Sequence, residues 1–249
     1  MNTLQKFSVS NIVKKLSFAT AGAACLTLGG VSASHAASII DTNPSWNGSS
    51  FIFPFGEPNT ATYGQTFTVT GSENILESFS FKVQTTSATP SKFAAYVAGW
   101  DGSKATSILY QSSLQTNSNN SAFNDFTFNT GGLALTSAQQ YVAFISASNF
   151  FDGQPDRSVL GFINSDVYSG GQFVFLNNGS NFSALTQTNW SRSEQFSRSS
   201  DVFGDLAFKA TFAAPTPVPV PGAVFGVIVA GGALVARQRK NAKAKQTVA

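Results

Sequence analysis

The side chains that carry out most covalent catalysis in proteins are nearly absent from this chain. Its only cysteine and its only histidine, Cys25 and His35, lie within the first 36 residues. We interpret those residues below as a leader that is removed on export. The exported protein would then lack thiolate catalysis, Ser-His-Asp catalysis, disulfide bonds and metal binding through Cys or His. Its chemistry must come from aromatic rings, carboxylates, amides and hydroxyls.

Aromatic residues offer one kind of site. Trp46, Trp100 and Trp190 could each stack on a pyranose ring, with Asn, Gln and Asp side chains supplying hydrogen bonds. Trp100 ends an apolar run just before an Asp-Gly turn, which favours a core position. Trp190 lies in a polar stretch, so it is the better candidate for a sugar contact, with Trp46 as the other. The favoured alternative is that these rings are buried in the core, as aromatic residues commonly are.

Carboxylates offer two further kinds of site. Asp152 and Asp156 flank a predicted loop, and oxygen ligands of this kind suit a structural Ca²⁺ ion. Turn-forming acids on a solvated surface are the favoured alternative, so we expect no cofactor. Two carboxylates on either side of a bond could also hydrolyse a glycoside. Because nucleophile and phosphate-loop motifs are absent, we expect a protein that is not an enzyme, with a carboxylate-dependent glycosidase as the alternative.

The elements that would position these residues are strands. Phe79, Phe81 and Val83 alternate with Ser80 and Lys82, which is the two-residue period of a strand with one buried face. Similar patterns predict further strands at 66–69, 92–100, 107–111, 124–128, 140–146, 158–163, 172–176 and 206–212, with one more at 51–53. Asp-Gly, Gly-Gly and Asn-Gly pairs mark turns between them. The polar stretches 111–122 and 180–201 are predicted to be irregular.

Many short strands without a helical pattern predict an all-β domain at residues 37–214. We expect an antiparallel β-sandwich of jelly-roll type. This segment holds all but three of the 24 Phe residues, an aromatic content that a packed core explains and a disordered chain lacks. It also holds seven basic and all twelve acidic residues, a net charge of 7 − 12 = −5. This charge gives no electrostatic case for nucleic-acid binding.

The N-terminal 36 residues have the features of a secretory signal peptide. Three lysines precede an uncharged apolar run at 16–31, and Ser34-His35-Ala36 places small residues before a cleavage site. We therefore predict cleavage by signal peptidase between Ala36 and Ala37. The alternative is a transmembrane helix that stays in the mature protein.

The C-terminus combines three segments that together are typical of a membrane-targeting signal. A proline-rich linker at 215–222 leads to an apolar segment at 223–236 and a basic tail at 237–249. As a helix, 222–236 would be about 22 Å long against a hydrocarbon core of about 30 Å, which suits a weak or temporary anchor. The basic tail is expected to stay in the cytoplasm, with the body on the opposite side of the membrane.

Pro219-Val220-Pro221, the short transmembrane segment, and the basic residues Arg237, Arg239 and Lys240 together resemble a PEP-CTERM sorting domain. The resemblance implies export in a Gram-negative bacterium, often one that makes exopolysaccharide, and recognition by an exosortase-type membrane protease. Val220 stands where the family motif has glutamate, which implies a variant of that protease. An ordinary single-pass tail anchor is the alternative for the same residues.

These features predict an exported, non-enzymatic β-sandwich protein that is membrane-anchored at least transiently. Its destination would be the cell surface or extracellular matrix, and its role structural or adhesive, in contact with exopolysaccharide. A carbohydrate-binding module with a defined groove is the alternative.

Overall fold

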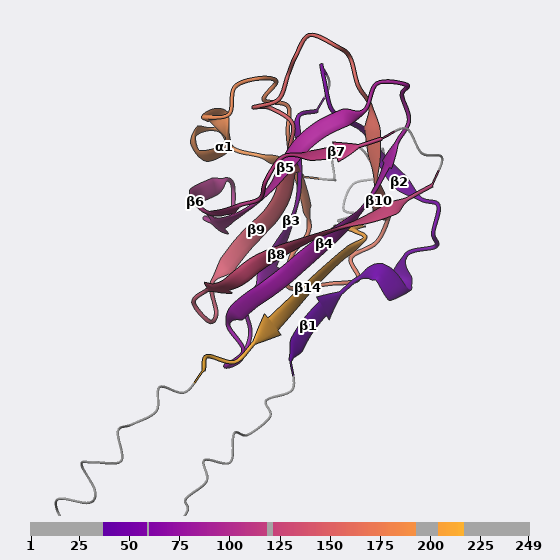
Figure 1. Cartoon of the computed structure of the whole chain (residues 1–249). Helices are drawn as coiled ribbons and strands as arrows, with labels where there is room; N and C mark the ends of the chain where they lie inside the picture. The colour runs from indigo at the N-terminus through magenta and orange to yellow at the C-terminus, as the bar shows by residue number, and fades with distance from the viewer. Residues whose placement is uncertain (1–36, 59, 119–121, 193–203, 217–249) are drawn as a thin grey trace, which may run out of the picture. The chain divides into compact units, whose positions relative to one another are not determined.

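The computed structural model describes residues 37–58, 60–118, 122–192 and 204–216. The predicted signal peptide, the membrane segment and the sorting signal therefore lie outside the described residues. Within them nearly all the regular elements are strands (Figure 1). The elements are β1 (Ser38–Asp41), the 3-10 turn η1 (Asn43–Ser45), β2 (Phe51–Phe55), β3 (Thr62–Thr68), β4 (Ile75–Thr85), β5 (Ser91–Trp100), β6 (Ala105–Gln111), β7 (Gln115–Asn117), β8 (Asn124–Ala134), β9 (Gln140–Ser146), β10 (Ser158–Ile163), β11 (Phe173–Leu176), α1 (Ala184–Gln187), β12 (Ser191–Arg192), β13 (Asp205–Leu206) and β14 (Phe208–Ala213).

The first sheet is organised around β4, and all its pairings are antiparallel. β8 lies on one side of β4, while β14 and β10 follow each other along the opposite side. Phe81 accordingly pairs with Phe208 of β14, and Val83 pairs with Leu160 of β10. β1 extends the sheet beyond β14, and β2 and β13 pair with β10. Figure 1 shows β8, β4, β14 and β1 side by side in this order.

The second sheet has the order β12-β11-β3-β9-β5-β6, and β7 also pairs with β5. It is antiparallel throughout. The core between the sheets is rich in Phe, because the inward positions of both sheets carry it. Phe67 of β3, for example, packs on Phe208 and Phe212 of β14 at centroid distances of 6.1 and 5.9 Å. The predicted all-β fold with two antiparallel sheets is therefore confirmed.

A second hydrophobic cluster lies on the opposite face of the second sheet. It joins Tyr96 and Trp100 of β5 and Phe144 of β9 with Leu185 of α1 and Trp190. The segment 177–192 thus covers this face, so β5 and β9 are buried on both faces. The polar stretch 180–201 was predicted to be irregular, which is wrong for α1 and β12. The prediction was also wrong for 111–122, where β7 pairs with β5 through backbone hydrogen bonds despite its polar side chains.

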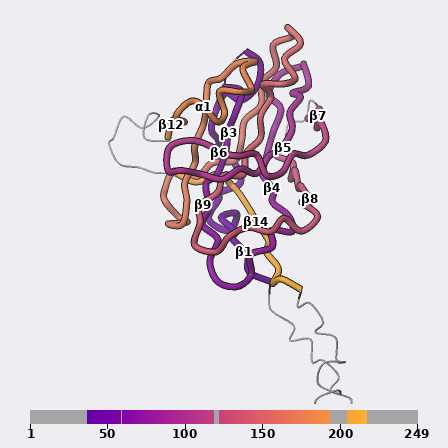
Figure 2. The backbone as a smooth tube through the Cα atoms, turned by 90° about the vertical axis from the view of Figure 1, so that its left-hand side faces the viewer, coloured from indigo at the N-terminus to yellow at the C-terminus, as the bar shows by residue number. Residues whose placement is uncertain are grey.

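The two ends of the described body lie next to each other. Ser38 at the start of β1 pairs with Phe212 near the end of β14. Figure 2, seen at 90° to Figure 1, shows β1 and β14 together at the same end of the body. The first and last strands of the described body therefore begin and end at the same end of the sandwich. In the part of the chain that the structure describes, no helix has the length and apolar character needed to cross a membrane.

Candidate functional site

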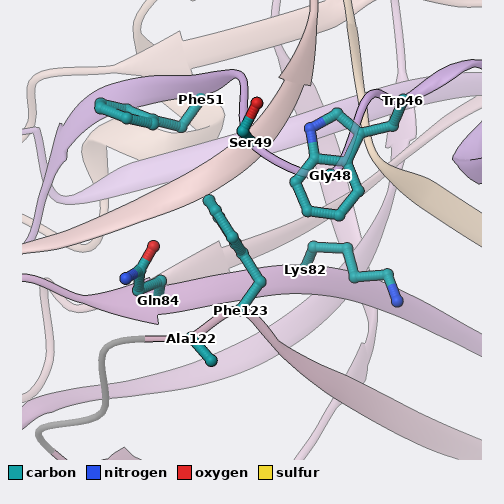
Figure 3. A pocket seen from close by; sticks show the side chains of 8 residues that line it. All are labelled: Trp46, Gly48, Ser49, Phe51, Lys82, Gln84, Ala122 and Phe123. Atoms are coloured by element: carbon teal, nitrogen blue, oxygen red, sulfur yellow. The ribbon is translucent and has the colours of Figure 1, made fainter.

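A groove of about 470 Å³ opens on the outward face of the first sheet. Its floor and walls come from β4, from the turn between η1 and β2, and from the residues before β8. The described residues that line it are Trp46, Gly48, Ser49, Phe51, Lys82, Gln84, Ala122 and Phe123. Figure 3 shows the ring of Phe123 pointing into the space between the side chains from the turn and those from β4.

The alternation of β4 explains why polar side chains reach this groove. Phe81 and Val83 point into the core, so Lys82 and Gln84 point to the opposite, outward face. Lys82 lies directly across from Asp125 of β8, and its Nζ donates a hydrogen bond to Asp125 Oδ2 at 2.8 Å. The groove therefore has an uncharged amide and a charge-paired ammonium group along one wall.

Trp46 is held in place by the turn that carries it. Its indole Nε1 donates a hydrogen bond to the Ser50 carbonyl at 2.7 Å. The side chain of Asn47 accepts backbone hydrogen bonds from Ser49 at 3.0 Å and Ser50 at 2.8 Å, which closes the same turn. The Trp46 ring also meets Phe123 edge-on, with a centroid distance of 4.9 Å and an interplanar angle of 82°. These contacts hold the ring in one orientation.

Gly161 in the neighbouring strand β10 makes room for this indole. A Cβ atom at this position would lie 3.1 Å from the Trp46 ring, 3.1 Å from Lys82 Cβ and 2.9 Å from Ala207 Cβ. Any larger residue would have to displace at least one of these side chains. The absence of a side chain at 161 therefore lets Trp46 lie against the sheet beside Lys82.

Exposed aromatic area continues along β2. Phe51, in the groove, is 53% exposed, and Phe53 on the same outward face is 43% exposed. The guanidinium carbon of Arg157 lies 5.9 Å from the centre of the Phe53 ring, within the range of a cation–π contact. Aromatic faces next to amide, hydroxyl and ammonium groups are suited to a ligand that has both apolar faces and hydrogen-bonding edges.

The structure separates the two tryptophans that were predicted to contact sugar. Trp46 lines the groove, as described above, but the ring of Trp190, the other predicted sugar contact, is buried and only 5% exposed. Its Nε1 donates to the Leu185 carbonyl at 2.9 Å, and its ring packs edge-on against Trp100 and Phe144. The polar residues around it in sequence concealed its role, which is to cover the second sheet. Trp100 is a core residue, as predicted.

The two weak calcium candidates lie in one loop region but have different partners. Asp152 forms an ion pair with Lys92 at 2.8 Å, and this contact lowers the pKa of its carboxyl group. Asp156 is buried and accepts a hydrogen bond from the Glu57 backbone at 2.9 Å, and burial raises its pKa. Glu57 in turn accepts backbone hydrogen bonds from Asp152 and Gly153. Among the described residues, no group of three or more His, Cys, Asp or Glu side chains could hold a metal ion.

A smaller hollow of about 240 Å³ lies at one end of the second sheet. It is lined by Gln140, Asp166, Ser169, Gly171, Gln172 and Arg192. No aromatic ring lines it among the residues described, and Arg192 already donates to the Gly102 carbonyl at 2.7 Å. It therefore lacks the combination of apolar face and polar edge that distinguishes the larger groove.

Trp46 could be singled out from the sequence, but the residues that complete its groove could not. The exposed position of Phe51 and the outward position of Lys82 follow from strand alternation. The sequence carries no signal that residues 46, 82 and 123 lie together, because pairing between distant strands creates that proximity.

The described residues form a β-sandwich with an aromatic-lined groove on one sheet face. No protein-family model and no curated protein matches the sequence. Among solved structures, the fold is similar to a Clostridial cysteine protease, Cwp84, after propeptide cleavage. The two share 15% sequence identity at a TM-score of 0.50, over 72% of this chain and 40% of that one.

A second similar structure contains the cysteine protease and lectin-like domains of Cwp84, a surface layer associated protein of Clostridium difficile. It shows 13% identity at a TM-score of 0.42, over 63% of this chain and 33% of that one. The present chain thus spans less than half the length of either. At these identities the likeness concerns the fold alone. Residues 37–249 contain no cysteine, so this part of the chain lacks the nucleophile of a cysteine protease.

Proposed function

We propose that this chain is an exported adhesive protein that contacts polysaccharide through the groove around Trp46. The observation that carries the proposal is the grouping of three aromatic rings, Trp46, Phe51 and Phe123, with the polar side chains of Ser49 and Gln84 in one groove. Sugar rings have apolar C–H faces and hydroxyl edges. Aromatic rings supply contact area to the faces, while amide and hydroxyl groups serve the edges.

The position of the groove supports a role at a surface. Ala213, at the end of β14, pairs with Ile75 at the start of β4. Lys82 lies seven residues farther along the same strand, which corresponds to about 23 Å. A body held by the segment after β14 would therefore present its groove well away from the point of attachment.

The proposal includes the targeting features of the two ends. Signal peptidase would cleave between Ala36 and Ala37, and an exosortase-like protease would read Pro219-Val220-Pro221 with the basic tail. The membrane segment would anchor the body at least transiently, before or during its delivery to the cell surface or matrix.

The order of the strands supports a jelly-roll arrangement. Every connection between consecutive strands from β2 to β5, and again from β7 to β11, passes from one sheet to the other.

The carboxylates favour binding over hydrolysis. Glu57 and Asp156, whose chain segments are hydrogen-bonded to each other, both accept hydrogen bonds from backbone N–H groups. These contacts tie the loop before β10 to the end of β2. Neither side chain lines the groove. A non-enzymatic protein therefore fits the arrangement of acids better than a glycosidase does.

Affinity electrophoresis of the purified full-length chain through gels containing a polysaccharide tests the proposal. Retardation by at least one neutral glucan, galactan or mannan is expected, and Trp46→Ala should abolish it. Leu114→Ala, which removes an apolar side chain that is 51% exposed and lies outside the groove, is the control and should migrate like the wild type. Unchanged retardation of a folded Trp46→Ala variant would contradict the proposed site.

A further inference from the structure

We propose that Asp125 makes the groove select uncharged polysaccharides over acidic ones, because its carboxylate is already ion-paired with the ammonium group of Lys82. This inference rests on the proposed function and names the class of sugar polymer that the groove takes. Asp125 does not line the groove itself. It acts on the ligand through Lys82 and is therefore a specificity-determining residue.

The charge pair is built into the register of the first sheet. Lys82 of β4 and Asp125 of β8 are directly paired residues on adjacent strands, so their side chains leave the same face side by side. The distance from Lys82 Nζ to Asp125 Oδ2 is 2.8 Å. The Lys82 side chain is 25% exposed and that of Asp125 is 57% exposed. Lys82 is thus the less exposed of the two side chains, and its ammonium group is already paired with a carboxylate.

Lys82 is the only charged residue among the described residues that line the groove. The other polar side chains there, Ser49 and Gln84, are uncharged and can both donate and accept hydrogen bonds, as sugar hydroxyls require. The segment 37–214 carries a net charge of −5, which repels a polyanion at low ionic strength. Within the segment 37–214, the charge at the groove and the net charge therefore agree in favouring a neutral ligand.

A uronic acid in the groove would have to share Lys82 with Asp125. Its carboxylate would then lie close to a second carboxylate, and like charges at such distances repel each other. Asp125→Asn removes the competing charge while keeping the size of the side chain. The ammonium group of Lys82 would then be free to pair with an acidic sugar.

The experiment compares neutral polysaccharides with polygalacturonate, using the full-length chain and the same gel assay. The full-length chain also carries basic residues at both ends, so Trp46→Ala gives the baseline for polygalacturonate held by those ends. Above this baseline, the wild type should bind a neutral polymer and not polygalacturonate. Asp125→Asn should bind polygalacturonate about 3- to 5-fold more strongly than the wild type, as expected for one exposed ion pair. This gain should vanish at high salt and in the double variant with Lys82→Met. Binding to the neutral polymer should change less than twofold.

Asp152→Asn provides the matched control. It removes the same charge from another ion pair of 2.8 Å, Lys92–Asp152, outside the groove, and should give no gain. Thermal unfolding of each variant checks that the sandwich is intact. Equal binding of the wild type to both polymers, or a folded Asp125→Asn without gain, would overturn the selectivity and leave the proposed function standing. A wild type that binds no polymer would contradict both the selectivity and the proposed function.

Discussion

The side chains of Gln65 and Asp205 are joined by a hydrogen bond of 2.7 Å, although 140 residues separate them in the sequence. Gln65 belongs to β3 of the second sheet and Asp205 to β13 of the first. Gln65 Oε1 also accepts the Leu206 backbone N–H at 2.8 Å, and Asp205 Oδ2 accepts those of Val167 and Tyr168. Gln65 and Asp205 are both buried, and their hydrogen bond connects the two sheets at one end of the sandwich.

Replacing Asp205 by Asn should therefore destabilise the fold. The amide keeps the size of the carboxylate, but its NH₂ group would face either Gln65 or the two backbone N–H donors. We expect a loss of about 1–3 kcal/mol in the free energy of unfolding, the cost of leaving a buried polar group unsatisfied. Urea denaturation measures the loss. Asp166→Asn, at an exposed neighbouring position, should change stability by less than about 0.5 kcal/mol.

The same carboxyl group should give a distinctive pH dependence. Burial raises the pKa of Asp205 above 3.8, despite hydrogen bonds from Gln65, Val167 and Tyr168. The native state then binds this proton more tightly than the unfolded chain does. The unfolding free energy of the wild type, relative to Asp205→Asn, should rise as the pH falls through the raised pKa and level off below 3.8. A relative stability that falls on acidification would show that the native state favours the charged form.

Gly56 should not tolerate even the smallest side chain. Its φ of +120° is unfavourable for other residues, and a Cβ atom would lie 2.0 Å from Asp156 Oδ1. Gly56→Ala should lower the unfolding free energy by about 1–3 kcal/mol through backbone strain, with the clash adding to this. Gly153→Ala is the control, because Gly153 also has a positive φ but faces open space. Equal losses in the two variants, measured by urea denaturation, would show that Asp156 imposes no steric limit.

Trp190 should contribute to the stability of the folded protein. Its buried ring packs on Trp100 and Phe144 and covers the outer face of the second sheet. Trp190→Ala should destabilise the protein by about 3–5 kcal/mol, as truncation of a large core aromatic does. Trp190→Phe, which keeps an aromatic ring, should lose less of the free energy of unfolding. Thermal unfolding followed by circular dichroism distinguishes the two, and an unaffected Trp190→Ala variant would contradict this role.

Local patterns predicted the strands well. The bounds expected for β9 and β10 agree with the structure at both ends, and β4 was identified from five alternating residues at its centre. Strand period is a property of neighbouring residues, so the sequence carries it directly. The short strands β7 and β12 escaped notice, because their polar side chains give no alternation and only backbone pairing defines them.

The sequence by itself determined the all-β class, the aromatic core and the absence of Cys and His from the body, because these depend on composition and local period. Only the tertiary structure decided which tryptophan is available to a ligand. Trp190 is buried by a sheet face that its polar neighbours in sequence do not reveal, whereas Trp46 meets Lys82 and Phe123 at a groove. Contacts of this kind depend on how distant strands pair, and pairing is a property of the whole chain.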